Sequence, residues 1–360
     1  MRQLTPSNKQ QGVALVIALV ITAVAVSLAS VAMYRQRIQI RLSANLSNLE
    51  QAYQYAIGME DWSKKILEKD YKDNPKVDSN KEDWHIALPP IPIQGGSLIG
   101  QLHDLQGRIN LNSLLMQYPS LARPARENTG RGNYYAHPQP QLGEKNKQII
   151  KTESLIHDAL TALISKIDTE QTLGLPENFV DLLWDWIDKD DKEREGGAES
   201  AYYQSLEKPY MTANTPFMDI SELLLLKDLN KEIVEKLKPL VSTLPKNTSI
   251  NLNTAPLEVL EAIGFDATTA TAIKKARDET PFENMNDFWN LEAVRTQFAP
   301  NSEMAKKKVN YRQILGLTTE YFLLQGKVNI HNSRIFINSV LERKKGKVRV
   351  IMRNYSNPSL

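Results

Sequence analysis

The 360-residue sequence contains no cysteine. Disulfide bonds, thiolate metal sites and cysteine nucleophiles are therefore excluded. It also lacks a strong excess of charge of either sign, since the net charge is +2. General nucleic-acid binders usually carry a large basic excess, so this balance disfavours that class. An apolar run long enough to cross a membrane occurs once, near the N-terminus, and we expect the rest of the chain to fold outside the bilayer.

The sequence also lacks a recognisable catalytic constellation. Its five histidines are scattered, and none has the H-E-x-x-H spacing of a zinc protease. A Walker loop and a G-x-G-x-x-G fingerprint are both missing. The run from Gly95 to Ile99 fails the G-x-S-x-G pattern at its last position. We therefore predict that the protein is not an enzyme.

The one long apolar run extends from Val13 to Met33. At about 1.5 Å per residue, a helix of this length spans roughly 31 Å, which matches a hydrocarbon core. The run is longer than the ~7–15 apolar residues of a secretory signal peptide, although small residues at 30–32 offer a cleavage site. The sequence predicts a transmembrane helix, with cleavage near Met33 as the alternative.

The helical pattern continues beyond the membrane. No proline interrupts the chain between residues 34 and 75. Apolar residues follow one helix face through this region: Leu42, Leu46, Leu49, Tyr53 and Ala56. We expect one long helix, apolar in its first half and amphipathic in its second.

Strand signals flank a block that is predicted to be helical. Ser97–Leu105 precedes the block, and the stronger signal lies at the C-terminal end, where Lys347–Val350 alternates after a turn at Lys344–Gly346. The predicted helices lie between these segments, at residues 150–166, 177–187, 218–240, 255–263 and 267–279. This order indicates a helical insertion in a small α/β unit.

Carboxylates crowd the stretch between residues 185 and 199: Asp185, Asp188, Asp190, Asp191, Glu193, Glu195 and Glu199. Calcium prefers six to eight hard oxygen ligands of this kind. An EF-hand that begins at Asp188 fails, because Lys192 and Glu193 stand where a ligand and the turn glycine belong. A differently folded calcium loop, turned by Gly196 and Gly197, and a solvated charged loop both stay open.

Residues 251–289 resemble a helix-hairpin-helix module with a turn at Ala262–Asp266. Nucleic-acid-binding versions combine a glycine-rich turn with nearby basic residues. Here only Gly264 remains in the turn, and acidic side chains outnumber basic ones. We therefore favour a structural helix pair. The motif INLN occurs at Ile109 and again at Ile250, which suggests that the block is built from related units.

Together these features resemble the K-type minor pseudopilin family of type II secretion systems, general secretion pathway protein K. The resemblance covers nearly the whole chain. Its motifs follow one another in order: QQGVALVIALVI at Gln10, GRINLNSLL at Gly107, LLWDWIDKDD at Leu182, GGAESAYY at Gly196, PYMTANTPFMDISEL at Pro209, INLNTAPLEVL at Ile250 and the terminal hairpin.

The resemblance implies a processed N-terminus. In pseudopilins a prepilin peptidase cuts the leader after a glycine, which here is Gly12. Val13 would become the N-methylated first residue, and the apolar helix would be kept. Most pilin-like subunits carry glutamate at the fifth mature position. The family's K-type members lack this glutamate, and this chain carries Ile17 there. A tip subunit has no neighbour to pair with that carboxylate, and an unpaired charge in an apolar layer is costly.

The resemblance also implies the fold. It is α+β, with a pilin-like long N-terminal helix on a small antiparallel sheet and a large all-α domain, with helix-hairpin-helix and SAM-like pieces, inserted into it. The expected division of the chain is a leader (1–12), the helix (13–66), a linker with the first strands (67–112), the inserted domain (113–318, with the calcium loop in 113–210 and a SAM-like part in 211–318) and the C-terminal strands (319–360).

Calcium in the acidic loop is a further implication of the resemblance. The expected ligands are Asp188, Asp190, Asp191 and Glu199, with Asp185 and Glu195 as additional candidates. The expected partners are the I-type and J-type minor pseudopilins, the major pseudopilin filament, the prepilin peptidase and the inner membrane. Secreted substrates are a further candidate partner, and no nucleic acid is expected.

The expected function is to form the tip of the periplasmic pseudopilus and so to support export of folded proteins across the outer membrane. The protein would lie in the bacterial inner membrane as a single-pass subunit, with the N-terminus cytoplasmic before processing and the C-terminal domain periplasmic. Two alternatives stay open: a membrane-anchored helix-hairpin-helix DNA-binding protein, and a signal-peptide-bearing periplasmic calcium-binding protein.

Overall fold

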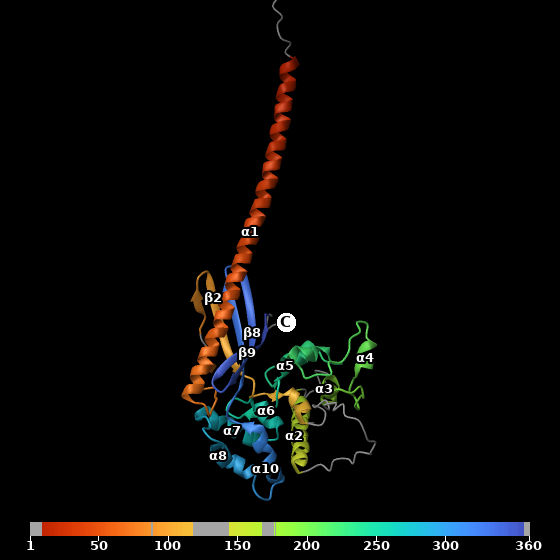
Figure 1. Ribbon diagram of the computed structural model, residues 1–360, viewed down its shortest axis with the longest axis vertical. Coiled ribbons are helices and arrows are strands. Elements are labelled where there is room, and N and C mark those ends of the chain that lie inside the picture. Colours follow the sequence, from red (N-terminus) through yellow and green to blue (C-terminus); the bar gives the residue numbers. More distant parts are fainter. Residues whose placement is uncertain (1–8, 88, 118–143, 168–175, 177, 356–360) are drawn as a thin grey trace, which may run out of the picture.

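Figure 1 shows the computed structural model of the chain, in which a long helix carries a small sheet on its lower part and a helical domain below the sheet. The structure describes residues 9–87, 89–117, 144–167, 176 and 178–355. It confirms the predicted α+β fold with a helical insertion between strands.

Helix α1 (Lys9–Asp73) is 65 residues long. Side chains 13–47 are all exposed, and by length and composition the helix can cross a membrane. It extends seven residues beyond the predicted end at residue 66. It stops before Asn74 and Pro75, because proline disfavours helical geometry in the residue that precedes it. Residues 67–73 therefore belong to the helix, and the linker that was predicted there starts later.

The sheet has five antiparallel strands in the order β1-β2-β7-β8-β9. The strands are β1 (Ile91–Ile93), β2 (Gly96–Asp104), β7 (Tyr321–Ile330), β8 (Ser333–Lys344) and β9 (Lys347–Asn354). A left-handed turn at Lys345 and Gly346 joins the last two strands, as predicted.

The long helix lies close to the sheet because small residues line the contact. Ala52 and Ala56 are fully buried against the strands. Gly100 and Gly326 are paired across β2 and β7, and a Cβ atom on either would lie 2.6 Å from the sulfur of Met59. These glycines therefore leave room for the Met59 side chain between helix and sheet.

The inserted domain leaves the sheet after β2 and returns before β7. Its strands form two short parallel pairs, and its elements are β3 (Ile109–Asn110), η2 (Leu111–Gln117), α2 (Glu144–Ile167), α3 (Phe179–Ile187), α4 (Ser200–Gln204), η3 (Ile220–Leu225), α5 (Lys231–Leu237), β4 (Val241–Ser242), β5 (Ile250–Asn251), α6 (Leu257–Ala262), α7 (Ala267–Glu279), α8 (Met285–Asn290), α9 (Glu292–Gln297), α10 (Glu303–Ile314) and β6 (Leu315–Gly316). The insertion thus begins near residue 107, earlier than the predicted residue 113, because the first INLN motif pairs with β4 rather than with the sheet.

The two INLN motifs occupy matching positions. The first contributes β3, which pairs in parallel with β4, and the second contributes β5, which pairs in parallel with β6. This supports the interpretation that the block consists of two related units. The predicted helix at 218–240 is two elements instead, since Asp219 caps η3 and Asn230 caps α5.

Candidate functional site

The acidic loop joins helices α3 and α4. Helix α3 buries Leu182, Leu183 and Trp186 in the core of the inserted domain, as its amphipathic spacing predicts. Its last backbone bond is made by Asp188, whose N–H donates to the carbonyl of Trp184 at 2.8 Å. The loop therefore starts from a fixed position on a buried helix.

The loop brings three of the six predicted ligands together. One carboxylate oxygen from each of Asp188, Asp190 and Glu199 lies within 4.8 Å of the other two. Asp188 and Glu199 are buried, whereas Asp190 is exposed. Both carboxylate oxygens of Glu199 and the Oδ1 of Asp188 are buried without a hydrogen-bond partner among the described residues. Buried carboxylate oxygens rarely stay unbonded, so this arrangement fits a cation.

The pKa values of the two buried carboxyl groups agree with this fit. Burial raises the pKa of Glu199 to about 7, and the nearby carboxylates of Asp185, Asp188 and Asp191 add to the rise. Burial also raises the pKa of Asp188, in spite of its ion pair. Negative charge is therefore in excess at this point, and a bound cation would relieve it.

Asp185, predicted as an additional ligand, binds Arg194. Its Oδ1 binds the guanidinium of Arg194 at 2.7 Å, and its Oδ2 accepts from the backbone N–H of Arg194 at 3.1 Å. The same guanidinium binds the Oδ2 of Asp188 at 2.6 Å. Asp185 is thus committed to holding Arg194 and through it the loop. Asp191 and Glu195 are exposed and lie outside the group of three.

Two glycines shape the return of the loop, as the sequence indicated. Gly196 has a φ of +82°, a backbone conformation that residues with side chains rarely adopt. A Cβ on Gly197 would lie 1.9 Å from the Oδ2 of Asp185. The turn therefore needs glycine at both positions.

One further polar group was missed by the sequence analysis. Asn214 has a φ of +48°, and its buried Oδ1 has no hydrogen-bond partner among the described residues. Its N–H donates to the carbonyl of Trp186 at 3.0 Å, two residues before Asp188. The hydroxyls of Ser200 and Thr212 are 2.7 Å apart, next to Glu199. Residues 212–214 therefore lie next to both the beginning and the end of the acidic loop.

The hairpin between α6 and α7 is built for packing. The backbone N–H groups of Ile263, Gly264 and Phe265 each donate to a carbonyl oxygen of α6. The carboxylate of Asp266 accepts from the N–H of Thr269 at 2.8 Å and so caps α7. These donors are not free to bind a phosphate, which is what a nucleic-acid-binding hairpin would use.

The predicted processing positions lie on α1. Gly12 and Val13 fall within the first turns of the helix, and Ile17 follows one turn later. Val13 is 60% exposed and Ile17 is 53% exposed, so neither packs against another element among the described residues. The apolar half of α1 thus extends away from the sheet and the inserted domain (Figure 1), and it is long and apolar enough to cross a membrane.

Comparison with known proteins agrees with this architecture. The family described as "Type II secretion system (T2SS), protein K" matches residues 107–246 and 250–306. The type II secretion system protein K of Pseudomonas aeruginosa is 30% identical, over 98% of this chain and 94% of that protein. Its counterpart in Aeromonas hydrophila is 27% identical, over 96% and 97% of the two chains.

A solved structure shares the fold. A chain in the crystal structure of the GspK-GspI-GspJ complex of enterotoxigenic Escherichia coli superposes with a TM-score of 0.66 and 23% sequence identity. The match covers 88% of this chain and 99% of that one. With near full-length relatives at up to 30% identity and this shared fold, the chain belongs to the type II secretion system protein K family and is a minor pseudopilin, a structural component of that secretion machine.

Proposed function

We propose that the protein forms the tip of the periplasmic pseudopilus with the I-type and J-type minor pseudopilins, on the filament of the major pseudopilin, and that it supports export of folded proteins across the outer membrane. The solved relative was crystallised as a complex of the three corresponding proteins. Secreted substrates would meet the inserted domain, which lies farthest from the membrane.

The observation that carries this proposal is the position of the inserted domain. The Ser333 hydroxyl contacts the carbonyl of Asn45 at 3.5 Å, so this end of the sheet faces the membrane-spanning part of α1. The insertion leaves from the opposite end, at Asp104 and Tyr321 (Figure 1). In a filament of parallel helices, a domain at that end would occupy the place of the next subunit and block further addition.

Removal of the inserted domain tests this proposal. The N–H of Leu105 lies 3.0 Å from the carbonyl oxygen of Tyr321, so a short glycine turn can replace residues 107–318 and leave the sheet connected. We expect the shortened chain to enter the membrane but to lose secretion of a folded reporter protein. Undiminished secretion by the shortened chain, at equal amounts in the membrane, would contradict the proposal.

The apolar helix fits a retained anchor in the inner membrane. We propose that the prepilin peptidase cuts after Gly12 and that Val13 becomes the N-methylated first residue, with the leader cytoplasmic and the head periplasmic. Ile17 would then stand at the fifth position, where a carboxylate would be unpaired at the tip.

We further propose that the acidic loop binds calcium through Asp188, Asp190 and Glu199. Their carboxylates are hard oxygen donors, and the buried oxygens without partners are placed to accept the ion. Asp191 and the amide oxygen of Asn214 are candidates for the remaining positions. A bound ion would stabilise the folded protein, because the unfolded chain does not hold these groups together.

Calcium titration of the full-length protein in detergent tests the assignment. We expect calcium to raise the melting temperature and Glu199→Gln to abolish most of that rise. Glu193→Gln is the matched control, because Glu193 is exposed in the same loop and lies outside the ligand group. Equal calcium responses in the two variants would overturn the ligand assignment.

A further inference from the structure

The inserted domain joins the pilin-like core through a narrow neck of two chain segments. Leu105–Arg108 leads out of the sheet, and Leu317–Glu320 leads back. The side-chain amide of Gln106 links them: its Nε2 donates to the carbonyl of Thr318 at 3.2 Å, and its Oε1 accepts from the N–H of Glu320 at 2.7 Å. Only these two chain segments connect the inserted domain covalently to the sheet.

A third segment, residues 77–82 after α1, lies against this neck. The N–H of Asp78 donates to the carbonyl of Leu317 at 2.8 Å, and its Oδ2 accepts from the N–H of Thr319 at 2.7 Å. Its carbonyl accepts from Asn251 of the inserted domain at 3.0 Å. Asp78 thus contacts both the neck and the inserted domain.

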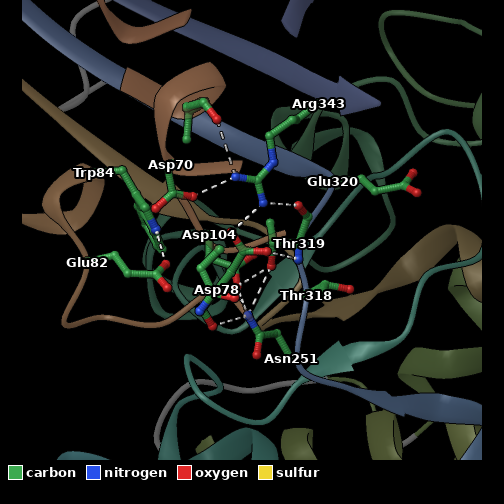
Figure 2. A network of polar contacts seen from close by, with 12 residues as sticks. Asp70, Asp78, Glu82, Trp84, Asp104, Asn251, Thr318, Thr319, Glu320 and Arg343 are labelled. Atoms are coloured by element: carbon green, nitrogen blue, oxygen red, sulfur yellow. Dashed lines mark hydrogen bonds and ion pairs between the residues drawn. The ribbon is translucent and has the colours of Figure 1, made fainter. Parts of the chain in front are cut away.

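The guanidinium of Arg343, on β8, lies where these segments meet (Figure 2). It donates to the Oδ2 of Asp70 on α1 at 2.7 Å and to the carbonyl of Thr319 at 3.0 Å. It also binds the Oδ1 of Asp78. The Arg343 side chain is 3% exposed and that of Asp78 is 2% exposed. One buried cation therefore connects the long helix, the sheet and the neck.

Carboxyl groups outnumber the cation at this joint. Asp70, Asp78, Glu82 and Asp104 all surround it (Figure 2), and burial raises the pKa of each. The pKa of Asp78 rises to about 7. One carboxylate oxygen from each of Asp70, Asp78 and Glu82 lies within 4.8 Å of the other two. Asp70 and Asp78 also bind the same guanidinium. A proton on one of these carboxyl groups therefore relieves their mutual repulsion.

Other charged groups near the joint leave the carboxyl groups in excess. Asp73 lies near Asp70 and adds negative charge. Arg108 and His85 lie near Asp104. The Asp104 carboxylate itself is held by neutral donors, among them the hydroxyls of Thr254, at 2.5 Å, and Thr319, at 2.6 Å.

We propose that this joint is a proton-holding lock that fixes the inserted domain to the pilin-like core. Arg343 supplies the positive charge, the carboxyl groups around it hold one proton, and loss of that proton loosens the contact between residues 77–82 and the neck. Charged carboxylates within 4.8 Å of one another repel each other, and the Arg343 guanidinium does not balance Asp70 and Asp78 together with Glu82 and Asp104. The lock is tightest in mild acid.

Hydrogen–deuterium exchange of the full-length protein in detergent tests the lock, with thermal unfolding at pH 5 and pH 8 beside it. In the wild-type chain, after correction for the intrinsic rise of amide exchange with pH, we expect residues 76–86 and 315–321 to be less protected, and the melting temperature to be lower, at pH 8 than at pH 5. Asp78→Asn keeps the size of the side chain and removes its titratable group, so it should remove this local pH dependence.

Two arginine variants provide the matched comparison. Arg343→Met leaves the carboxylates without their cation, so it should speed exchange at the joint strongly at pH 8 and much less at pH 5. Arg349→Met removes an exposed arginine that binds Glu342 on the neighbouring strand, and it should not change exchange at the joint. If Arg343→Met fails to fold, Asp78→Asn still decides. Unchanged pH dependence in Asp78→Asn would overturn the proposal.

Discussion

The side-chain amide of Asn112 makes two hydrogen bonds to the backbone of Phe217. Its Nδ2 donates to the Phe217 carbonyl at 2.9 Å, and its Oδ1 accepts from the Phe217 N–H at 2.8 Å. Asn253 makes the same two bonds to Phe282, at 3.1 and 2.9 Å. Each phenylalanine ends a Thr-Pro-Phe triplet. The second asparagine of each INLN motif therefore closes one unit of the inserted domain.

These paired hydrogen bonds predict that a single substitution of the asparagine will strongly destabilise the protein. Asn253→Ala leaves a buried N–H and a buried carbonyl without partners, and we expect it to lower the free energy of unfolding by about 2–4 kcal/mol. Chemical denaturation followed by tryptophan fluorescence measures this loss. Asn80→Ala, at an exposed position, is the control. Equal stability of the two variants would show that the hydrogen bonds between Asn253 and Phe282 do not stabilise the inserted domain.

The contact between α1 and β9 makes a second prediction. Glu60 is 1% exposed and binds Arg353 at 2.7 and 2.8 Å and the Ser339 hydroxyl at 2.8 Å. Glu60→Ala should therefore cost about 2–3 kcal/mol. The double variant Glu60→Ala/Arg353→Ala should cost less than the sum of the two single changes, since the groups are paired. Additive costs would argue against direct coupling.

Gly58 offers a stabilising change. It lies inside α1, and a Cβ at this position meets no atom within 4 Å. Alanine has the higher helix propensity, so Gly58→Ala should raise the free energy of unfolding by about 0.5–1 kcal/mol. A shift of the denaturation midpoint to higher denaturant concentration is the expected readout, and a shift to lower concentration would contradict it.

Gly197→Ala, in contrast to Gly58→Ala, should be destabilising, and its effect should be at the acidic loop. The added methyl group displaces the Asp185 carboxylate, which holds Arg194. We expect a weaker calcium-dependent rise in melting temperature than in the wild-type chain. Gly58→Ala serves as the control, because it should keep the full calcium response.

Ile17→Glu tests the tip position within the membrane. At the tip, the new carboxylate finds no neighbouring amino terminus and stays unpaired in the apolar layer, at a cost of a few kcal/mol. We expect less secretion of a folded reporter protein than with Ile17→Leu, at equal amounts of the two variants in the membrane. Full secretion by the glutamate variant would place the subunit within the filament instead.

Local patterns were sufficient to predict much of the fold. The apolar and amphipathic halves of α1, the strand Ser97–Leu105 and the C-terminal hairpin were all readable from periodicity and breakers. Helices α8, α9 and α10 were missed, although the capping box at Asn284 and Asp287 and the cap at Ser302 mark two of their starts. These helices are short or lack a clear apolar stripe, so periodicity does not detect them.

Long-range pairings set the limit of the sequence analysis. Arg343 binds Asp70 and Asp78, which lie 273 and 265 residues away, and no local pattern relates such positions. In the acidic loop the sequence indicated Asp188, Asp190 and Glu199, but the commitment of Asp185 to Arg194 depends on the path of the loop through Gly196 and Gly197.

The mature N-terminus is the most direct test of the central claim that this chain is a processed, membrane-anchored pseudopilin. Mass spectrometry of the membrane fraction, with and without an active prepilin peptidase, gives the answer. We predict a peptide that starts at N-methylated Val13 and disappears without the peptidase. A mature chain that starts near Met33 would mean that the apolar helix is discarded, and the assembly function would then be contradicted.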